Sequence, residues 1–134
     1  MVRTRMLASA VLAAAVALVG LVARDAFAQI GQVRVDSGLA RYDGKCPAHI
    51  TFAGHIAITT TPITLNYHWE SNDGKRSQVQ VTTVHNSKVA NLESKMTWNF
   101  GTKGKPSNVV VKLVVASGNQ TVTGQSPTIA VNCR

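Results

Sequence analysis

The chain contains two cysteines, Cys46 and Cys133. Their chemistry would decide the compartment of the protein and much of its fold. Taken alone, Cys46 could be a reactive thiol, a lipid attachment point, a metal ligand or half of a disulfide. No C-x-x-C pair or Cys/His cluster surrounds either cysteine, which argues against a zinc site. A catalytic thiol at Cys46 would leave Cys133 without a role. A disulfide gives both residues a role, provided that the chain reaches an oxidising compartment.

The four histidines, His49, His55, His68 and His85, are the next candidates, since imidazole serves both as a metal ligand and as a general base. His49 and His55 share one face of a predicted strand, but their spacing places them roughly 20 Å apart. They cannot share a metal ion without a bulge or bend. His68 lies on the next segment and could approach another histidine across a sheet. We expect solvent-facing histidines and no metal site. A small metal-binding protein or hydrolase that uses His49, His55 or His68 is the third-ranked alternative.

The acidic residues after residue 28 do not form a recognisable catalytic pair. Asp43 and Asp73 both precede glycine, and turn geometry accounts for them. Glu70 and Glu93 lie on strand faces that could converge, but nothing in the sequence demonstrates the spacing that a glycosidase pair needs. The G-x-S-x-G, H-E-x-x-H, P-loop and dinucleotide-binding motifs are all absent. We therefore expect no enzyme and no cofactor.

The chain opens with a pattern typical of a secretory leader. Two arginines precede an almost unbroken apolar run, Met6 to Val22, and Ala26-Phe27-Ala28 then places small residues where a signal peptidase reads them. We expect residues 1–28 to be a signal peptide that is cleaved before Gln29. The alternative is an uncleaved membrane anchor, but the apolar run is at the low edge of the roughly 20 residues that span a bilayer.

Cleavage would leave residues 29–134, a length that usually forms one domain. No cysteine follows the cut directly, so lipid attachment is not expected. An exported chain with two cysteines is most simply disulfide-bonded, and the one intramolecular connectivity joins Cys46 to Cys133. Closing so long a loop is worth about 4 to 5 kcal/mol in the chain-entropy model, comparable to the net stability of a small domain. We expect a secreted or periplasmic protein with no transmembrane segment after cleavage.

Alternation of apolar and polar residues dominates the chain after residue 28, and helix-period patterns are almost absent. The clearest case is ITLNYHWE, Ile63 to Glu70, which reads as a half-buried strand. Ser71-Asn72-Asp73-Gly74 follows as a turn, because Asp-Gly supplies the positive φ of a tight hairpin. Seven or eight such strands without a crossover helix favour an antiparallel all-β sandwich. The predicted strands cover Gln32–Asp36, Cys46–Ile58, Ile63–Glu70, Gln78–His85, Asn91–Phe100, Val109–Val115, Gln120–Thr123 and Thr128–Cys133.

Strand parity makes two further predictions. Cys46 shares parity with Phe52, and Cys133 shares parity with Val131, so both cysteines are expected to point towards the core, as a buried bridge requires. The strand Val109–Val115 is rich in valine on both faces. We expect it to be central in its sheet; the alternative is that its outer face meets a partner.

An early cysteine, an apolar Trp on a following strand and a late cysteine resemble an immunoglobulin-type sandwich. More narrowly, YDGKCPAHITFAGHI followed by ITLNYHWESNDGK resembles a group of small bacterial secreted immunoglobulin-like domains. A C-P strand start, an F-x-G-x-I strand and a Y-x-W hairpin ending in S-D-G recur there; the hairpin of this chain, Tyr67 to Gly74, has one extra residue. The resemblance implies a fold and brings no catalytic motif. Because Cys133 lies on the last predicted strand, the bridge would tie an early strand to the final one rather than join the usual B and F strands.

Basic residues exceed acidic ones, which gives the whole chain a formal net charge of +8, and several basic pairs fall at predicted turns. The functional interpretation is a cationic binding surface of Lys75, Arg76, Lys103 and Lys105 for an anionic glycan or cell-envelope polymer. The alternative is ordinary solubility and protection of strand edges. A nucleic-acid partner is not expected, because both tryptophans share parity with core residues and would not stack on bases.

Together these patterns predict a secreted, non-enzymatic immunoglobulin-like domain, residues 29–134. Its expected role is to bind an unknown protein or an anionic glycan at the cell surface or in the periplasm. The runner-up is a structural subunit that assembles through exposed strand edges.

Overall fold

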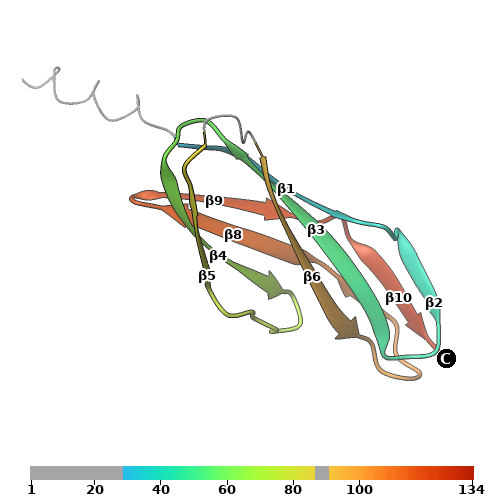
Figure 1. The fold of residues 1–134 in the computed structure, drawn as a ribbon. Coiled ribbons are helices and arrows are strands. Elements are labelled where there is room, and N and C mark those ends of the chain that lie inside the picture. The colour runs from blue at the N-terminus through green and yellow to red at the C-terminus, as the bar shows by residue number, and fades with distance from the viewer. Residues whose placement is uncertain (1–28, 87–90) are drawn as a thin grey trace, which may run out of the picture.

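The computed structural model describes residues 29–86 and 91–134, which form ten strands and no helix (Figure 1). The predicted all-β class is confirmed, and the strands pair antiparallel except for β2 with β10. The predicted signal peptide, residues 1–28, lies outside the described residues. The strands are β1 (Ile30–Ser37), β2 (Arg41–Gly44), β3 (Ala48–Ile58), β4 (Ile63–Ser71), β5 (Gln80–Val84), β6 (Asn91–Phe100), β7 (Ser107–Val109), β8 (Val111–Ser117), β9 (Gln120–Gln125) and β10 (Ile129–Cys133).

Two of these strands, β2 and β7, are not among the seven or eight that the sequence predicts. β2 occupies part of the segment predicted as a turn, and its residues pair in parallel with β10 near the other end of the chain. β7 is a short strand on the opposite edge of β10. Both owe their extended conformation to a distant partner strand, which local turn residues do not reveal.

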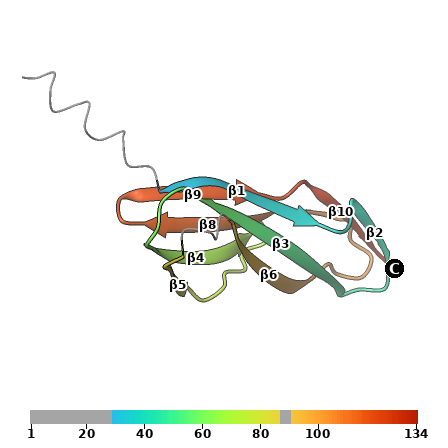
Figure 2. The same ribbon diagram turned by 45° about the horizontal axis from the view of Figure 1, so that its top comes forward.

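Two sheets face each other and enclose the core between them (Figures 1 and 2). One has the order β1-β3-β6 and the other the order β5-β4-β8-β9. They approach closely at Gly54 of β3, where a Cβ atom would lie closer than 3.0 Å to the side chain of Leu113 on β8. On one side, β1 packs directly against β9, and Gly124 lies against the backbone of Val33. That side is therefore closed.

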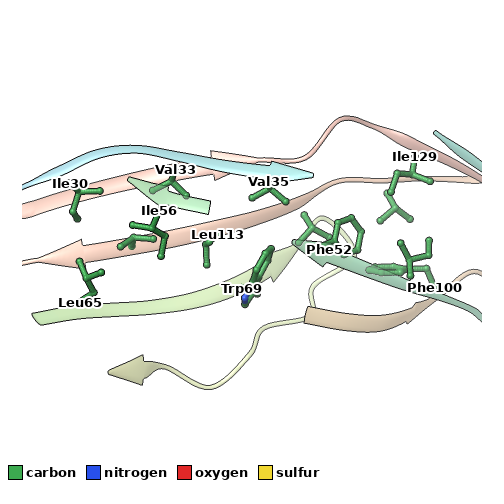
Figure 3. Close-up of a cluster of buried hydrophobic side chains, with 14 of the residues drawn as sticks. Ile30, Val33, Val35, Phe52, Ile56, Leu65, Trp69, Phe100, Leu113 and Ile129 are labelled. Carbon is green, nitrogen blue, oxygen red and sulfur yellow. The ribbon is translucent and has the colours of Figure 1, made fainter. Parts of the chain in front are cut away.

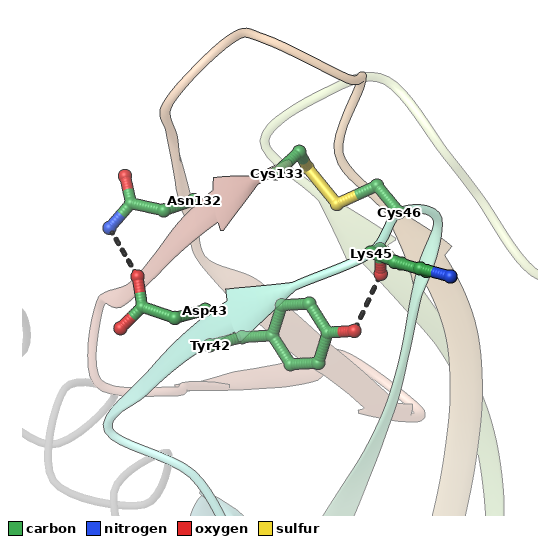
Figure 4. Close-up of a disulfide and its surroundings, with 6 residues drawn as sticks. All are labelled: Tyr42, Asp43, Lys45, Cys46, Asn132 and Cys133. Atoms are coloured by element: carbon green, nitrogen blue, oxygen red, sulfur yellow. Dashed lines mark hydrogen bonds between the residues drawn. A yellow bond between two sulfur atoms is a disulfide. The ribbon is translucent and has the colours of Figure 1, made fainter.

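A third, small sheet of order β2-β10-β7 forms the end of the molecule that carries the C-terminus. The predicted disulfide is present there, with 5.3 Å between the Cα atoms of Cys46 and Cys133 (Figure 4). One expectation is wrong: Cys46 does not begin the first long strand, because β3 starts at Ala48. Cys46 instead lies in the turn that joins β2 to β3. Both cysteines are half-buried rather than fully enclosed.

The predicted inward faces of most strands are confirmed by burial (Figure 3). Alternate apolar residues of β3, β4 and β8 are buried, apart from the partly exposed Ile58 and Tyr67, as a sheet with one face on a core requires. β8 lies between β4 and β9, which confirms the central position predicted for the strand Val109–Val115, most of whose residues belong to β8. The buried core consists of Ile30, Val33, Val35, Ala48, Ile50, Phe52, Ile56, Ile63, Leu65, Trp69, Val84, Phe100, Val109, Val111, Leu113, Val115, Ile129 and Val131.

β6 is the exception to this pattern. Its inward row was expected to be core, yet only Phe100 is buried, while Leu92, Met96 and Trp98 remain partly exposed. β6 is the last strand of its sheet, on the side of the molecule opposite the contact between β1 and β9.

Within residues 29–86 and 91–134, we find no helix with the length and apolar character that crossing a membrane requires.

Candidate functional site

A groove opens between the two sheets on the side where β6 and β5 are the last strands of their respective sheets. Its volume is about 480 Å³, within the range of roughly 300 to 1,000 Å³ typical of ligand pockets. β6 supplies one wall, and β4 with the segment that follows it supplies the other. The lining residues are Tyr67, Trp69, Ser77, Gln78, Gln80, Ser94, Lys95, Met96 and Trp98.

The floor of the groove is held by hydrogen bonds of Trp69. Its indole Nε1 donates to Oγ of Ser94 on the facing sheet at 3.2 Å. Its backbone N–H donates to Oγ of Ser77 at 2.8 Å, and the N–H of Ser77 donates back to the Trp69 carbonyl at 2.9 Å. These bonds position the segment after the β4 hairpin against β4, so the floor is fixed by β4, β6 and this segment together.

One end of the groove is anchored to the core through aromatic rings. The ring of Trp98 meets Phe100 edge to face, with 6.4 Å between centroids, and Phe100 meets Phe52 in the same way at 6.0 Å. Such pairs are worth about 0.5–1.5 kcal/mol beyond the area that they bury. The ammonium of Lys75 lies over the Phe100 ring, 4.5 Å from its centroid. Trp98 is therefore a half-exposed ring on a rigid support.

The chemistry that this groove offers is that of binding. Trp98, Met96 and Tyr67 present apolar surface, and Gln78 and Gln80 place amide groups at the rim. Lys95 also borders the groove, but its ammonium lies 3.8 Å from the carboxylate of Glu93 on the outer face of the sheet. Stacking on a ring combined with a few amide donors is an arrangement that suits sugars and extended peptides.

The basic residues predicted as a binding surface fall in two connections. Lys75 and Arg76 lie between β4 and β5, and Lys103 and Lys105 lie between β6 and β7. The two connections are neighbours, because the side chain of Asn72 bonds to the backbone of the β7 region. The four side chains nevertheless have different surroundings.

Lys75 is already engaged by the protein itself. Its ammonium pairs with Asp73, whose carboxylate also accepts a hydrogen bond from Ser71. Partial burial of Asp73 favours its neutral form, but the bonds from Lys75 and Ser71 outweigh this and lower the pKa of Asp73. The backbone of Arg76 forms an isolated β-bridge with that of Glu70, and the Arg76 charge contributes to lowering the pKa of Glu70. Lys103 and Lys105, in contrast, are exposed and have no carboxylate partner among the described residues.

The histidines occupy separate places. His49 lies in register with Asn99, and His55 is 3.6 Å from the carboxylate of Asp36. His68 bonds to Glu70 at 2.6 Å, and this bond is the main cause of a lowered pKa of Glu70. In the part of the chain that the structure describes, no three His, Cys, Asp or Glu side chains gather as a metal site would require.

The sequence left open that Glu70 and Glu93 converge, but the structure keeps them apart. Glu70 follows the inward Trp69 and lies in register with Lys112, on the outer face of the four-stranded sheet. Glu93 lies in register with His55, on the outer face of the three-stranded sheet. The two carboxylates therefore point away from each other on opposite faces of the molecule, so they cannot act together as a catalytic pair.

The groove residues were missed because parity assigns a side chain to a face and says nothing of what covers that face. The available signal was Ser94, a hydroxyl in a row that otherwise reads as core. Trp69 is buried, so its indole N–H needs an acceptor, and Ser94 supplies it. Ser94 therefore marks the point where the inward row of β6 borders the polar rim of the groove rather than a closed core.

The disulfide end contains a second cluster of polar contacts. Asn132 donates to Asp43 at 3.0 Å (Figure 4). Arg41 lies 2.9 Å from the same carboxylate. The hydrogen bond from Asn132 is the main reason why the pKa of Asp43 is lowered, with the charges of Arg41 and Arg134 adding to it. The hydroxyl of Tyr42 donates to the Lys45 carbonyl at 2.6 Å.

Comparison with known proteins yields no family model and no curated protein that matches this chain.

Proposed function

We propose that the protein is an exported, non-enzymatic immunoglobulin-like domain that binds a protein or glycan outside the cytoplasm through the groove between β5 and β6. The observation that carries the proposal is the half-exposed aromatic wall of that groove. Trp98 and Tyr67 offer rings to a ligand, and Met96 offers a flexible apolar contact.

The strand order supports an immunoglobulin-like topology. β1, β3 and β6 correspond to strands A, B and E of one sheet, and β5, β4, β8 and β9 correspond to C′, C, F and G of the other. β10 continues the last strand after Pro127. The bridge departs from antibody domains, because it joins the turn before the B-like strand to the end of the chain.

Export is supported by two features. The disulfide is consistent with an oxidising compartment, and the leader pattern of residues 1–28 directs a chain there.

The test is a titration of the purified protein against panels of glycans and peptides, followed by intrinsic tryptophan fluorescence. A ligand that covers Trp98 should change the emission, and Trp98→Phe should remove most of that change. Gln78→Ala/Gln80→Ala should weaken binding without touching the core. The matched control is Asn99→Ala, on the outer face of β6 next to Trp98, and this variant should bind normally. Equal binding by the control and all groove variants would refute the groove as the site.

Strand-edge assembly is a second candidate function, and one observation favours it. Val81 on β5 is 64 % exposed, and β5 is the last strand of its sheet among the described residues. Exposed apolar edge strands recruit other strands. Analytical ultracentrifugation should then show association that Val81→Lys abolishes. A strictly monomeric wild-type protein at high concentration would exclude this function.

A further inference from the structure

The basic side chains of this protein differ in whether a carboxylate lies beside them. Most of the basic side chains in the described part of the chain lie beside a carboxylate. Arg34 pairs with Asp36, Arg41 with Asp43, Lys75 with Asp73 and Lys95 with Glu93, while Arg76 and Lys112 flank Glu70. Six cations form no ion pair among the described residues: Arg76 and Lys112, whose charges act on Glu70, and Lys45, Lys103, Lys105 and Arg134, here called the cationic end. The charge of Arg134 also acts on Asp43, a carboxylate that Asn132 and Arg41 already bind.

All four residues of the cationic end are held around the disulfide. Lys45 precedes Cys46, and Arg134 follows Cys133. The loop that carries the two lysines reaches the same point, since the N–H of Gly104 donates to the Cys133 carbonyl at 3.3 Å. Residues that are far apart in the sequence are therefore gathered at one end of the molecule, and all four side chains are exposed.

The backbone beneath these side chains is fixed by further bonds. The N–H of Arg134 donates to the Gly44 carbonyl at 2.8 Å, and the Tyr42 hydroxyl donates to the Lys45 carbonyl at 2.6 Å. The loop is closed by a bond from the N–H of Lys105 to the Thr102 carbonyl at 3.0 Å. A rigid base reduces the entropy that binding would otherwise lose in ordering the loop.

We propose that the cationic end is a docking surface for a linear acidic polysaccharide, such as a polymer of uronic acids. The argument is charge complementarity, because like charges without internal partners attract a polyanion and release its counterions. Three of the four cations are lysines, which act as point charges and suit spaced single carboxylates; bidentate recognition of phosphate favours arginine. This surface is separate from the groove and does not depend on it.

The features of this end do not suit other polyanions. Its aromatic rings are Tyr42, whose hydroxyl is tied to Lys45, and Phe100, which is buried beneath Lys75, so neither is presented to nucleic-acid bases. Membrane docking needs exposed apolar side chains beside the cations. Among the described residues, the large exposed apolar side chains are Leu39, Val79 and Val81, which belong to other segments.

The inference changes the surface that the sequence predicts. Lys103 and Lys105 stay in it. Lys75 leaves it because it pairs with Asp73, and Arg76 leaves it because its backbone bridges to Glu70, on whose carboxylate its charge acts. Lys45 and Arg134 join it, although the sequence places them far from the other two.

The test measures binding of purified protein to fluorescently labelled polygalacturonate, with neutral dextran, oligo(dT) and vesicles containing phosphatidylglycerol as comparison probes. We expect binding to polygalacturonate that weakens at least about tenfold when NaCl is raised from about 20 to about 150 mM. Lys103→Gln/Lys105→Gln and Lys45→Gln/Arg134→Gln should each weaken binding at least about threefold, with circular dichroism confirming the fold.

The charge-matched control is Arg34→Gln/Lys112→Gln, which removes the same number of cations from the outer faces of the sheets. This control should change binding less than twofold, because salt screens exposed charges that lie far from the binding surface. Equal losses in the control would show that net charge alone attracts the polymer and would overturn the proposal. Absence of binding, or tighter binding of oligo(dT) or vesicles than of polygalacturonate, would overturn it too. Trp98→Phe should have no effect here, so failure of this surface and failure of the groove are distinguishable.

Discussion

The indole Nε1 of Trp69 donates a hydrogen bond to Oγ of Ser94 at 3.2 Å, and this bond joins the four-stranded sheet to the three-stranded sheet. Trp69 is almost fully buried, so its N–H has little access to water and needs a protein acceptor. Ser94 is the acceptor, and it also lines the groove. The same bond therefore serves the packing of the two layers and the shape of the candidate site.

Replacing Ser94 with alanine should reduce the free energy of unfolding by about 1–3 kcal/mol, because a buried indole N–H is left without its acceptor. Urea denaturation followed by fluorescence measures the loss. Ser107→Ala, at an exposed position of β7, is the matched control and should stay within about 0.5 kcal/mol of wild type. A similarly small effect at Ser94 would mean that the groove admits a water molecule to Trp69.

Residue periodicity predicted the inward faces well because burial in a sheet follows a strict period of two. Ile50 and Phe52 on β3, and Leu113 and Val115 on β8, are all enclosed as that period requires. The same rule could not show how much of a face the opposite sheet covers. The inward row of β6 has the correct parity, yet Met96 and Trp98 line an open groove, since coverage depends on where β5 lies.

The disulfide was predictable, and its surroundings were not. Two cysteines in a chain with a predicted export leader allow one intramolecular pairing, and it is present. The parity that placed Cys46 in a strand failed, because Pro47 separates it from β3 and a parallel partner converts the preceding turn into β2. Likewise, sequence spacing grouped cations by their turns, whereas compensation depends on which carboxylate each one reaches in space, as Lys75 does with Asp73.

Gly101 and Gly104 offer a matched pair that isolates a contact with the disulfide. Both have positive φ, 95° and 80°, so alanine at either position strains the backbone by about 1 kcal/mol. A Cβ at Gly101 would also lie closer than 3.0 Å to both sulfur atoms, while a Cβ at Gly104 meets nothing within 4 Å. We expect Gly101→Ala to lose at least about 2 kcal/mol more stability than Gly104→Ala.

Thermal denaturation compares the two glycine variants, and titration of free thiols reports whether the bridge forms. Gly101→Ala should leave a larger fraction of reduced cysteine after oxidative refolding. Equal stability and equal oxidation of the two variants would contradict the close approach of the Gly101 backbone to the bridge.

Asp43 should make the stability of the disulfide end sensitive to acid. Its pKa is lowered below 3.8, first by the hydrogen bond from Asn132 and then by Arg41 and Arg134. Because the folded pKa lies below the unfolded value, the ionised group stabilises the fold above that value, and the contribution is lost as the pH falls through the folded pKa. An NMR titration of the Asp43 carboxyl carbon should show a midpoint below 3.8, and Asn132→Ala should raise it. Asn99→Ala, which removes an amide on β6, should leave the midpoint unchanged; a shift of equal size there would refute the assignment.

Removing the bridge should cost much of the stability of this small domain. The bond joins residues 87 positions apart, so Cys46→Ala/Cys133→Ala should lower the free energy of unfolding by about 2–5 kcal/mol, measured by urea denaturation. Hydrogen exchange should accelerate in β2 and β10 more than in β4 and β8, because the bridge ties the turn after β2 to the last residue of β10. Wild-type protein reduced with dithiothreitol is the control and should lose a similar amount. A loss below about 1 kcal/mol would mean that the parallel pairing, with the bond from Arg134 to Gly44, holds this end without the bridge.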